Sequence, residues 1–233
     1  MNQASSVVAI VHIVDDDASF LEAVSRLLRA SGFTVETFDS AAALLAQVSP
    51  ETRGCVIADL RMPGVSGLDL QEALVKSCLT LPVIFLTGQG DISSSVRAMR
   101  HGAEDFLEKS APKNQLLDAV KRALDRDARE FAKRTRLQAL RSAFDALSPR
   151  EREVLTHVVR GQMNKEIAAD LNIHERTVKA HRTAITTKLG VHSVAELTRL
   201  WMEAGRAGDE GARDEGKNEG RGTRVEGGIR VQW

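Results

Sequence analysis

The chain has 233 residues, of which 42% are hydrophobic, and its formal net charge is zero. This length suits one large or two small globular domains. No apolar run reaches the ~18 residues that a membrane span needs, and the first residues lack the charged-then-apolar pattern of a signal peptide. We therefore expect a soluble, cytoplasmic protein with no membrane partner.

The zero net charge conceals an uneven distribution along the chain. Residues 1–120 carry 15 acidic and 9 basic side chains, residues 121–147 carry 4 and 8, and residues 148–204 carry 7 and 9. An acidic first half followed by a basic region is typical of a pocket for a charged ligand joined to a reader of a polyanion.

In the first 120 residues, apolar runs of strand length alternate with segments of helical periodicity. The predicted strands are residues 8–14, 34–38, 55–59, 82–87 and 104–107. The predicted helices are residues 18–30, 41–48, 68–76 and 92–100, followed by a long helix from Lys113. Ser40 and Asp91 are predicted N-caps. The alternation predicts an α/β fold, a doubly wound sheet of five parallel strands with helical crossovers.

The predicted long helix contains a short apolar seam. No strong helix breaker occurs between Gln115 and Leu147, and Leu137, Leu140, Phe144 and Leu147 follow one another with 3-4-3 spacing. This seam is consistent with two interpretations, a linker helix that packs on its own domains and a helix that dimerises.

A second set of helices follows the seam and makes an all-α, four-helix domain. Ser148, Pro149 and Glu151 have the pattern of a capping box at a helix start. That helix is predicted to end at Gly161, and further helices cover residues 164–171, 175–189 and 193–202. Residues 204–233 are mainly glycine and charged residues, so a disordered tail is predicted. Mildly apolar residues return only at 229–233.

Polar residues stand at the carboxyl ends of the predicted strands, where a doubly wound sheet binds its ligands. Asp15 and Asp16 follow the first strand, Asp59 and Thr87 end two others, and Lys109 comes just after the last. An acidic pocket accepts a phosphoryl donor only with a divalent cation, and Mg²⁺ prefers oxygen ligands. Asp16 and Asp59 are candidate direct ligands, with Asp15 acting through water. Asp59 is also the candidate nucleophile, and Lys109 and Thr87 would contact the phosphoryl oxygens.

None of these residues identifies a binding site when taken alone. For example, an Asp-Asp pair after a strand is more often part of a solvated turn. Only the set, in this order and spacing, favours a site. Asp17 extends the acidic run and is expected to be solvated.

Two segments resemble known families. Residues 8–125 resemble the receiver domain of bacterial two-component response regulators, through Asp15-Asp16, the run DLRMPG from Asp59, Thr87-Gly88 and Lys109. Residues 147–203 resemble the LuxR/NarL/FixJ-type helix-turn-helix DNA-binding domain, through LSPREREVLTHVVRGQMNKEIAADLNIHERTVKAHRTAITTKLGV. Residues 126–146 would form a linker helix between them. The runs HIVDDD and DLRMPGVSG resemble the regulators of nitrogen fixation and aromatic degradation.

The resemblance implies a switch rather than an enzyme. A sensor histidine kinase would transfer a phosphoryl group to Asp59, and the backbone carbonyl of Arg61 would add a Mg²⁺ ligand. Thr87 would then move toward the phosphoryl group, and Phe106 would turn inward. Phosphorylation would give a homodimer or release the DNA-binding domain onto promoter DNA, with RNA polymerase as a further partner and activation as the favoured outcome.

One residue departs from the receiver pattern. The family has proline directly after the lysine, behind a cis peptide bond that aims the amine, whereas Ser110 follows Lys109 here. A cis bond before a residue other than proline costs roughly 3–4 kcal/mol. Either the bond is cis at that cost, or it is trans and Lys109 moves. We expect weakened phosphorylation or altered switching, and faster phosphorylation of Ser110→Pro.

The predicted helix 175–189 has the pattern of a DNA-recognition helix. Val178, Ile185 and Leu189 share one face, which should pack inward. The opposite face suits the major groove, because its residues are small or cationic: Arg176, Lys179, Ala180, Thr183 and Thr187. Residues at its edges are placed to contact phosphates: Lys165, Thr177, Arg182 and Lys188. The small net charge of this domain favours two copies on paired half-sites.

Three alternatives differ in class. A phosphatase with an aspartate nucleophile would need a second acid where Arg61 stands, so it is disfavoured. A quorum-type sensor of a small molecule would need an aromatic-rich cavity, and only 4% of the residues are aromatic. The remaining alternative is a phosphorylation-independent DNA-binding regulator with a degenerate receiver that only dimerises, and Ser110 is its support.

Overall fold

The computed structural model describes residues 8–88 and 92–205, which fall in two units, Met1–Ala132 and Lys133–Trp233. The elements of the first unit are β1 (Ile10–Val14), α1 (Ala18–Ala30), β2 (Thr34–Phe38), α2 (Ala41–Gln47), β3 (Gly54–Asp59), α3 (Gly67–Lys76), β4 (Val83–Thr87), α4 (Ile92–Arg100), β5 (Asp105–Glu108) and the start of α5 (Lys113–Asp145). The second unit contains the end of α5, then α6 (Pro149–Val159), α7 (Asn164–Asp170), α8 (Glu175–Leu189) and a helical stretch over residues 194–205.

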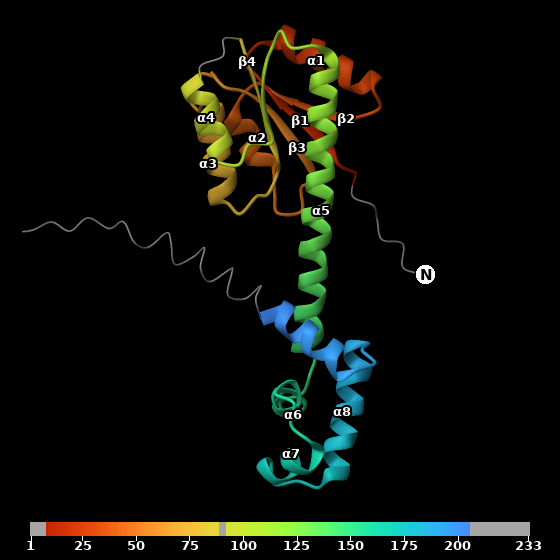
Figure 1. Cartoon of the computed structure of the whole chain (residues 1–233). Coiled ribbons are helices and arrows are strands. Elements are labelled where there is room, and N and C mark those ends of the chain that lie inside the picture. Colours follow the sequence, from red (N-terminus) through yellow and green to blue (C-terminus); the bar gives the residue numbers. More distant parts are fainter. Residues whose placement is uncertain (1–7, 89–91, 206–233) are drawn as a thin grey trace, which may run out of the picture. The chain divides into compact units, whose positions relative to one another are not determined.

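The first unit is built on a single sheet of parallel strands in the order β2-β1-β3-β4-β5. This order confirms the predicted doubly wound α/β fold, and no strand end differs from its predicted position by more than two residues. Figure 1 shows the strands side by side with helices on both sides of the sheet. Because β1, β3 and β4 are adjacent, their carboxyl ends meet at one edge.

Both faces of the sheet are covered, as continuous apolar strands require. Successive residues of a strand point to opposite faces. Val14 and Phe85 lie in the core that includes residues of α2, α3 and α4. Val11 and Ile84 lie in the core that α1 and α5 close. In the described part of the chain, no helix is both long and apolar enough to cross a membrane.

Polar N-caps fix where several helices begin. Ser40 caps α2 as predicted, and Ser148 and Glu151 form the predicted capping box of α6. Asp17 is exposed, as expected, and its carboxylate in addition accepts hydrogen bonds from the backbone N–H groups of Ser19 and Phe20 and so caps α1. The predicted cap Asp91 lies outside the described residues, as does the predicted tail beyond residue 205.

The second unit has its own apolar core, and the end of α5 contributes to it. Phe144 and Leu147 are buried there together with the inward residues of α8, Val178 and Ile185. Leu140 packs against the same core. These three positions of the 3-4-3 seam therefore support the interpretation of a linker helix that packs on its own domain.

A buried ion pair ties α5 to the sheet at the end opposite to the acidic residues. Arg53 lies directly before β3, and its Nε lies 2.7 Å from Oδ2 of Asp127, whose side chain is 2% exposed. The guanidinium also stacks 3.8 Å from the ring centroid of Phe131. The first unit therefore includes α5 residues beyond residue 125, which is where the sequence predicted the first domain to end.

We expect Asp127→Ala to destabilise the first unit by about 3 kcal/mol, because it leaves a largely buried guanidinium without its carboxylate. Asp118→Ala is a matched control, since it removes an exposed pair with Lys121 and should cost less than about 0.5 kcal/mol. Hydrogen exchange of β3 amides in the full chain measures the difference. Equal protection in the two variants would contradict a structural role for the Arg53 pair.

His12 makes the stability of the sheet dependent on pH. Its side chain is buried, and within the described residues neither ring nitrogen has a hydrogen-bond partner. Burial lowers the pKa of His12, and attraction by Glu36, 3.5 Å away, only partly offsets this. The unfolded chain therefore binds a proton more readily than the folded one, so folding stability is complete above the unfolded pKa of about 6.5 and decreases below it.

We expect the folding stability to decrease by up to about 1.4 kcal/mol per pH unit as the pH falls below the unfolded pKa of His12. The decrease should be smaller in His12→Gln. Urea unfolding followed by circular dichroism between about pH 7.5 and about pH 5.5 measures both slopes. A slope that the substitution leaves unchanged would show that another group is responsible.

Candidate functional site

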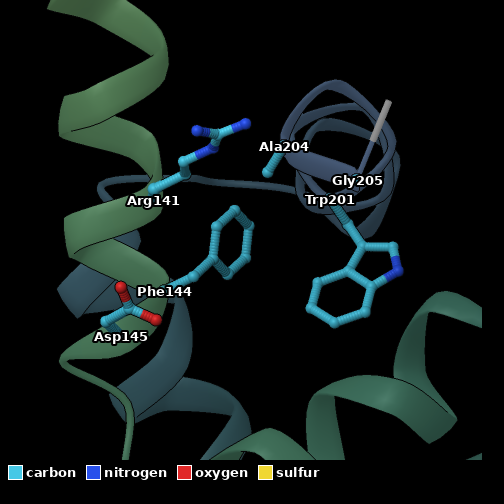
Figure 2. Close-up of a pocket in the computed structure, with 6 residues that line it drawn as sticks. All are labelled: Arg141, Phe144, Asp145, Trp201, Ala204 and Gly205. Carbon is cyan, nitrogen blue, oxygen red and sulfur yellow. The ribbon is translucent and has the colours of Figure 1, made fainter. Parts of the chain in front are cut away.

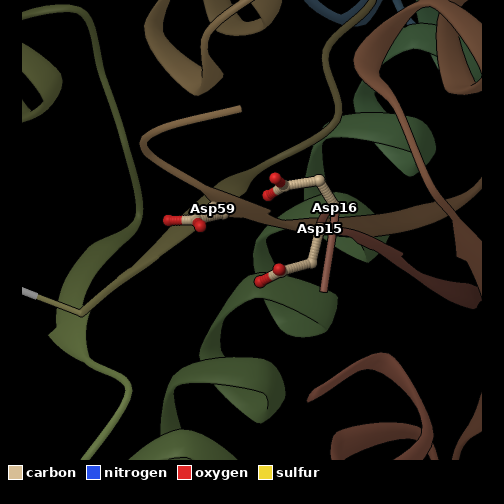
Figure 3. Close-up of side chains that lie close together, drawn as sticks. All are labelled: Asp15, Asp16 and Asp59. Carbon is tan, nitrogen blue, oxygen red and sulfur yellow. The ribbon is translucent and has the colours of Figure 1, made fainter. Parts of the chain in front are cut away.

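The predicted acidic residues converge at the carboxyl edge of the sheet. Asp15 and Asp16 follow β1, Asp59 ends β3 and Thr87 ends the neighbouring β4. Figure 3 shows the three aspartates gathered at these strand ends. One carboxylate oxygen from each aspartate lies within 4.8 Å of the other two. The sequence thus predicted a cluster that the parallel topology brings together.

The cluster fits the donor set of a hard divalent cation. Its ligand atoms are all carboxylate oxygens, which Mg²⁺ prefers. Asp15 is 1% exposed, Asp59 is 9% exposed, and Asp16 faces solvent. Burial raises the pKa of Asp15, and its contacts with Lys109 and the backbone of Asp17 only partly offset this. A buried carboxylate with a raised pKa gains from added positive charge.

Lys109 supplies the positive charge of the cluster. Its Nζ lies 3.0 Å from Oδ2 of Asp59 and 2.6 Å from Oδ2 of Asp15, the second contact being an ion pair without hydrogen-bond alignment. Burial disfavours the ammonium form, but the close contacts with the two carboxylates and their charges outweigh it and raise the pKa of Lys109. The amine is therefore charged and placed next to the candidate nucleophile.

The Lys109–Ser110 bond is trans, since the described chain contains no cis peptide bond. Of the two alternatives the trans bond is the one observed, and the Lys109 amine still reaches both carboxylates of the site. The backbone N–H of Lys109 donates to the Thr87 carbonyl at 2.7 Å, and Ala111 N–H donates to the Glu108 carbonyl in a tight turn. These bonds hold the segment in place without proline.

Backbone packing holds Asp59 in position. Oδ1 accepts a hydrogen bond from the backbone N–H of Arg61 at 3.3 Å. Gly67, the first residue of α3, lies so close that a Cβ there would be 2.3 Å from the Asp59 carbonyl oxygen. Glycine at this position therefore allows α3 to approach the strand end.

The two candidate switch residues lie on neighbouring strands. The Thr87 side chain is almost fully buried at the end of β4. Phe106 on β5 is half-buried, and its ring packs at a tilt against Phe85 with 6.2 Å between centroids. The Phe106 ring therefore packs against the core and remains partly exposed.

Sequence reasoning missed one contact of the site. The Lys109 ammonium lies 4.3 Å from the ring centroid of Phe20 on α1. A cation–π contact of this kind adds to the restraint on the amine. No sequence pattern predicted this contact, because Phe20 and Lys109 are far apart in the sequence.

The second candidate site is the exposed face of α8. As predicted, Val178 and Ile185 are buried, which turns the small and cationic residues outward. The predicted DNA contacts that are exposed are Lys165 on α7 and, on α8, Arg176, Thr177, Lys179, Ala180, Thr183, Thr187 and Lys188. Lys165 and Thr177 also line an open hollow of about 620 Å³ between α7 and the start of α8.

Two of the predicted phosphate contacts are engaged within the unit. Lys188 Nζ lies 2.7 Å from Oε2 of Glu151, whose side chain is 7% exposed. This hydrogen bond and that of the Ser148 backbone lower the pKa of Glu151 to about 2. Arg182 donates to Oδ1 of Asn164 at 2.8 Å. Lys188 and Arg182 thus brace α8 against α6 and α7, which spacing alone did not indicate.

A parallel sheet with this acidic cluster, joined to a helical unit with a cationic helix face, defines the class of response regulators. A model of the response regulator receiver domain matches residues 11–121, and a model of bacterial regulatory proteins of the luxR family matches residues 145–201. The chain belongs to the response regulators that combine these two domains. It is a transcription regulator with a LuxR-type DNA-binding domain and not an enzyme.

Full-length relatives agree with this assignment. Nodulation protein W of Bradyrhizobium diazoefficiens is 41% identical over 84% of this chain and 86% of its own length. The response regulator protein TodT of Pseudomonas putida is 41% identical over 82% of this chain and 85% of its own. The solved structure of the response regulator StyR has 44% identity and a TM-score of 0.79, and covers 84% of this chain and 99% of its own.

Proposed function

We propose that Asp59 accepts a phosphoryl group from a sensor histidine kinase and that phosphorylation licenses binding to promoter DNA. The observation that supports this most directly is the placement of the Lys109 ammonium 3.0 Å from Oδ2 of Asp59. A carboxylate beside a fixed ammonium, at the ligand-binding edge of a parallel sheet, is suited to become an acyl phosphate.

The residues present have distinct roles in this proposal. Asp59 attacks phosphorus while the bond between phosphorus and the donor breaks and its electron pair leaves with the donor. Lys109 transfers its hydrogen bond from Asp59 to a phosphoryl oxygen. Mg²⁺, when bound to Asp16, Asp59, the Arg61 carbonyl and, through water, Asp15, would neutralise charge on the donor and the acceptor. Positioning and charge neutralisation then provide most of the catalysis.

The signal would leave the site through Thr87 and Phe106. The Thr87 hydroxyl moves to the phosphoryl group, and the Phe106 ring follows into the space vacated beside Phe85. This changes the surface formed by α4 and β5, so that a charge at the site becomes a change in packing.

The output would be a homodimer on promoter DNA that activates transcription, with RNA polymerase as partner. Lys179 donates to guanine in the major groove, and Ala180 or the Thr183 methyl group meets a thymine methyl. Lys165 and Thr177 contact phosphates. Two copies on paired half-sites compensate for the low charge of one domain.

The first experiment is incubation of the full chain with acetyl phosphate and Mg²⁺, followed by intact mass. We expect one phosphoryl adduct, together with a shift toward dimer in light scattering. Asp59→Asn should give neither, because an amide is not the nucleophile that a carboxylate is. An adduct on the variant would refute Asp59 as acceptor.

Failure of the wild-type chain with acetyl phosphate and with candidate kinases would favour the alternative function. The receiver would then be a phosphorylation-independent dimerisation module. DNA binding that is equal for the wild type and Asp59→Asn would agree with this alternative.

Ser110→Pro is expected to accelerate phosphorylation by acetyl phosphate. Proline stiffens the turn that presents Lys109, and among the described residues the backbone N–H of Ser110 has no hydrogen-bond acceptor that would be lost. Ser110→Ala is the control, because it removes only the hydrogen bond from Ser110 Oγ to Glu108. An unchanged rate in Ser110→Pro would show that the trans linkage already places the amine adequately.

Lys179→Ala and Lys188→Ala should separate DNA contact from structural support. Lys179→Ala is expected to weaken binding to in vitro selected duplexes by about 1–3 kcal/mol and to relax base preference at one position. Lys188→Ala should instead lower the melting temperature of the second unit, because it leaves the Glu151 carboxylate without its ammonium partner. Loss of affinity in Lys188→Ala with an unchanged melting temperature would assign it to the DNA.

A further inference from the structure

The second unit carries an uncovered aromatic feature that neither the acidic cluster nor the α8 face uses. Trp201 is 37% exposed and its ring meets that of Phe144 edge to face, with 5.5 Å between centroids. The next residue, Met202, is 56% exposed. Large apolar side chains grouped in this way indicate a surface that another group covers.

Two hollows include Trp201 in their lining. The Phe144 hollow has a volume of about 320 Å³ and is lined by Arg141, Phe144, Asp145, Trp201, Ala204 and Gly205. Figure 2 shows Arg141 and Phe144 reaching from α5 toward the helix that carries Trp201 and Ala204. The Met202 hollow has about 450 Å³ and is lined by Val159, Thr198, Trp201, Met202 and Gly205. Gly205 borders both hollows.

The chain itself provides an occupant of matching chemistry. Residues 206–228 leave from Gly205 and consist largely of glycine and charged residues. Apolar residues then return as Ile229, Val231 and Trp233, separated by the polar Arg230 and Gln232. This alternation places three apolar side chains on one face of an extended segment.

We propose that residues 229–233 dock on the Trp201 surface of the same chain, with the Trp233 indole in the Phe144 hollow. The segment thereby covers Trp201 and Met202 and prevents any other molecule from using this surface until it is released.

The length of the connection makes the contact intramolecular. A glycine-rich linker of the length of residues 206–228 spans roughly 25 Å on average, and its first residue is attached at the rim of both hollows. The local concentration of the segment is therefore of millimolar order. An intrinsic dissociation constant below about 1 mM suffices for the surface to be occupied most of the time.

Charges at the rim of the Phe144 hollow match those of the segment. Arg141 and Asp145 are exposed, and neither has an ion pair with another described residue. The tail offers Glu226 for Arg141 and Arg230 for Asp145, one of each sign on either side of Ile229. Exposed pairs of this kind add little affinity but fix the direction in which the segment lies.

The test uses the full chain labelled with 5-fluorotryptophan. Its two tryptophans, Trp201 and Trp233, give two fluorine signals, which Trp233→Phe assigns. We expect the Trp233 signal to be protected several-fold from a soluble paramagnetic agent. Deletion of residues 229–233 should make the Trp201 signal more accessible.

Ala204→Arg should block the Phe144 hollow and return Trp233 to full accessibility. Ala195→Arg makes the same substitution at an exposed position of the same helix that lines neither hollow, so it should leave the protection intact. A Trp233 signal that is fully accessible in the wild-type chain would overturn the proposal. Protection that disappears on dilution would also overturn it and would assign the surface to a second copy of the chain.

Discussion

The mutual repulsion of three carboxylates is the constraint around which the first unit is organised. Asp15, Asp16 and Asp59 present oxygens within 4.8 Å of one another, an arrangement that costs free energy unless positive charge is close. Lys109 provides that charge, held by its backbone bond to Thr87 and by the ring of Phe20. The same repulsion that makes the cluster costly would favour the proposed binding of a cation.

β3 connects this electrostatic edge with the opposite end of the sheet. Asp59 ends the strand, whereas Gly54 begins it with a φ of 129°, so close to β1 that a Cβ would lie 1.8 Å from the Ile10 carbonyl oxygen. Arg53, one residue earlier, makes the buried pair with Asp127 on α5. One fully buried strand therefore carries the candidate acceptor at one end and the anchor of the long helix at the other.

In the second unit, the two faces of α8 differ: one packs on the core and the other is exposed. Val178 and Ile185 bury one side of α8, and the Lys188–Glu151 pair fastens its end to α6. The opposite side is exposed, as the proposed contact with DNA requires. Because Glu151 also belongs to the capping box of α6, a single carboxylate fixes both the start of one helix and the orientation of another.

The sequence by itself determined the order and type of the elements, the helix caps at Ser40 and Ser148 and the identity of the acidic residues, because periodicity and capping act over a few neighbouring residues. Parallel alternation even implied that Asp15, Asp59 and Thr87 would meet. Only the tertiary structure decided which partners they have. The reach of Lys109 across a trans bond, its contact with Phe20 and the engagement of Lys188 by Glu151 join residues far apart in the chain. Such contacts depend on how helices and strands pack in three dimensions, and residue spacing carries no information about that packing.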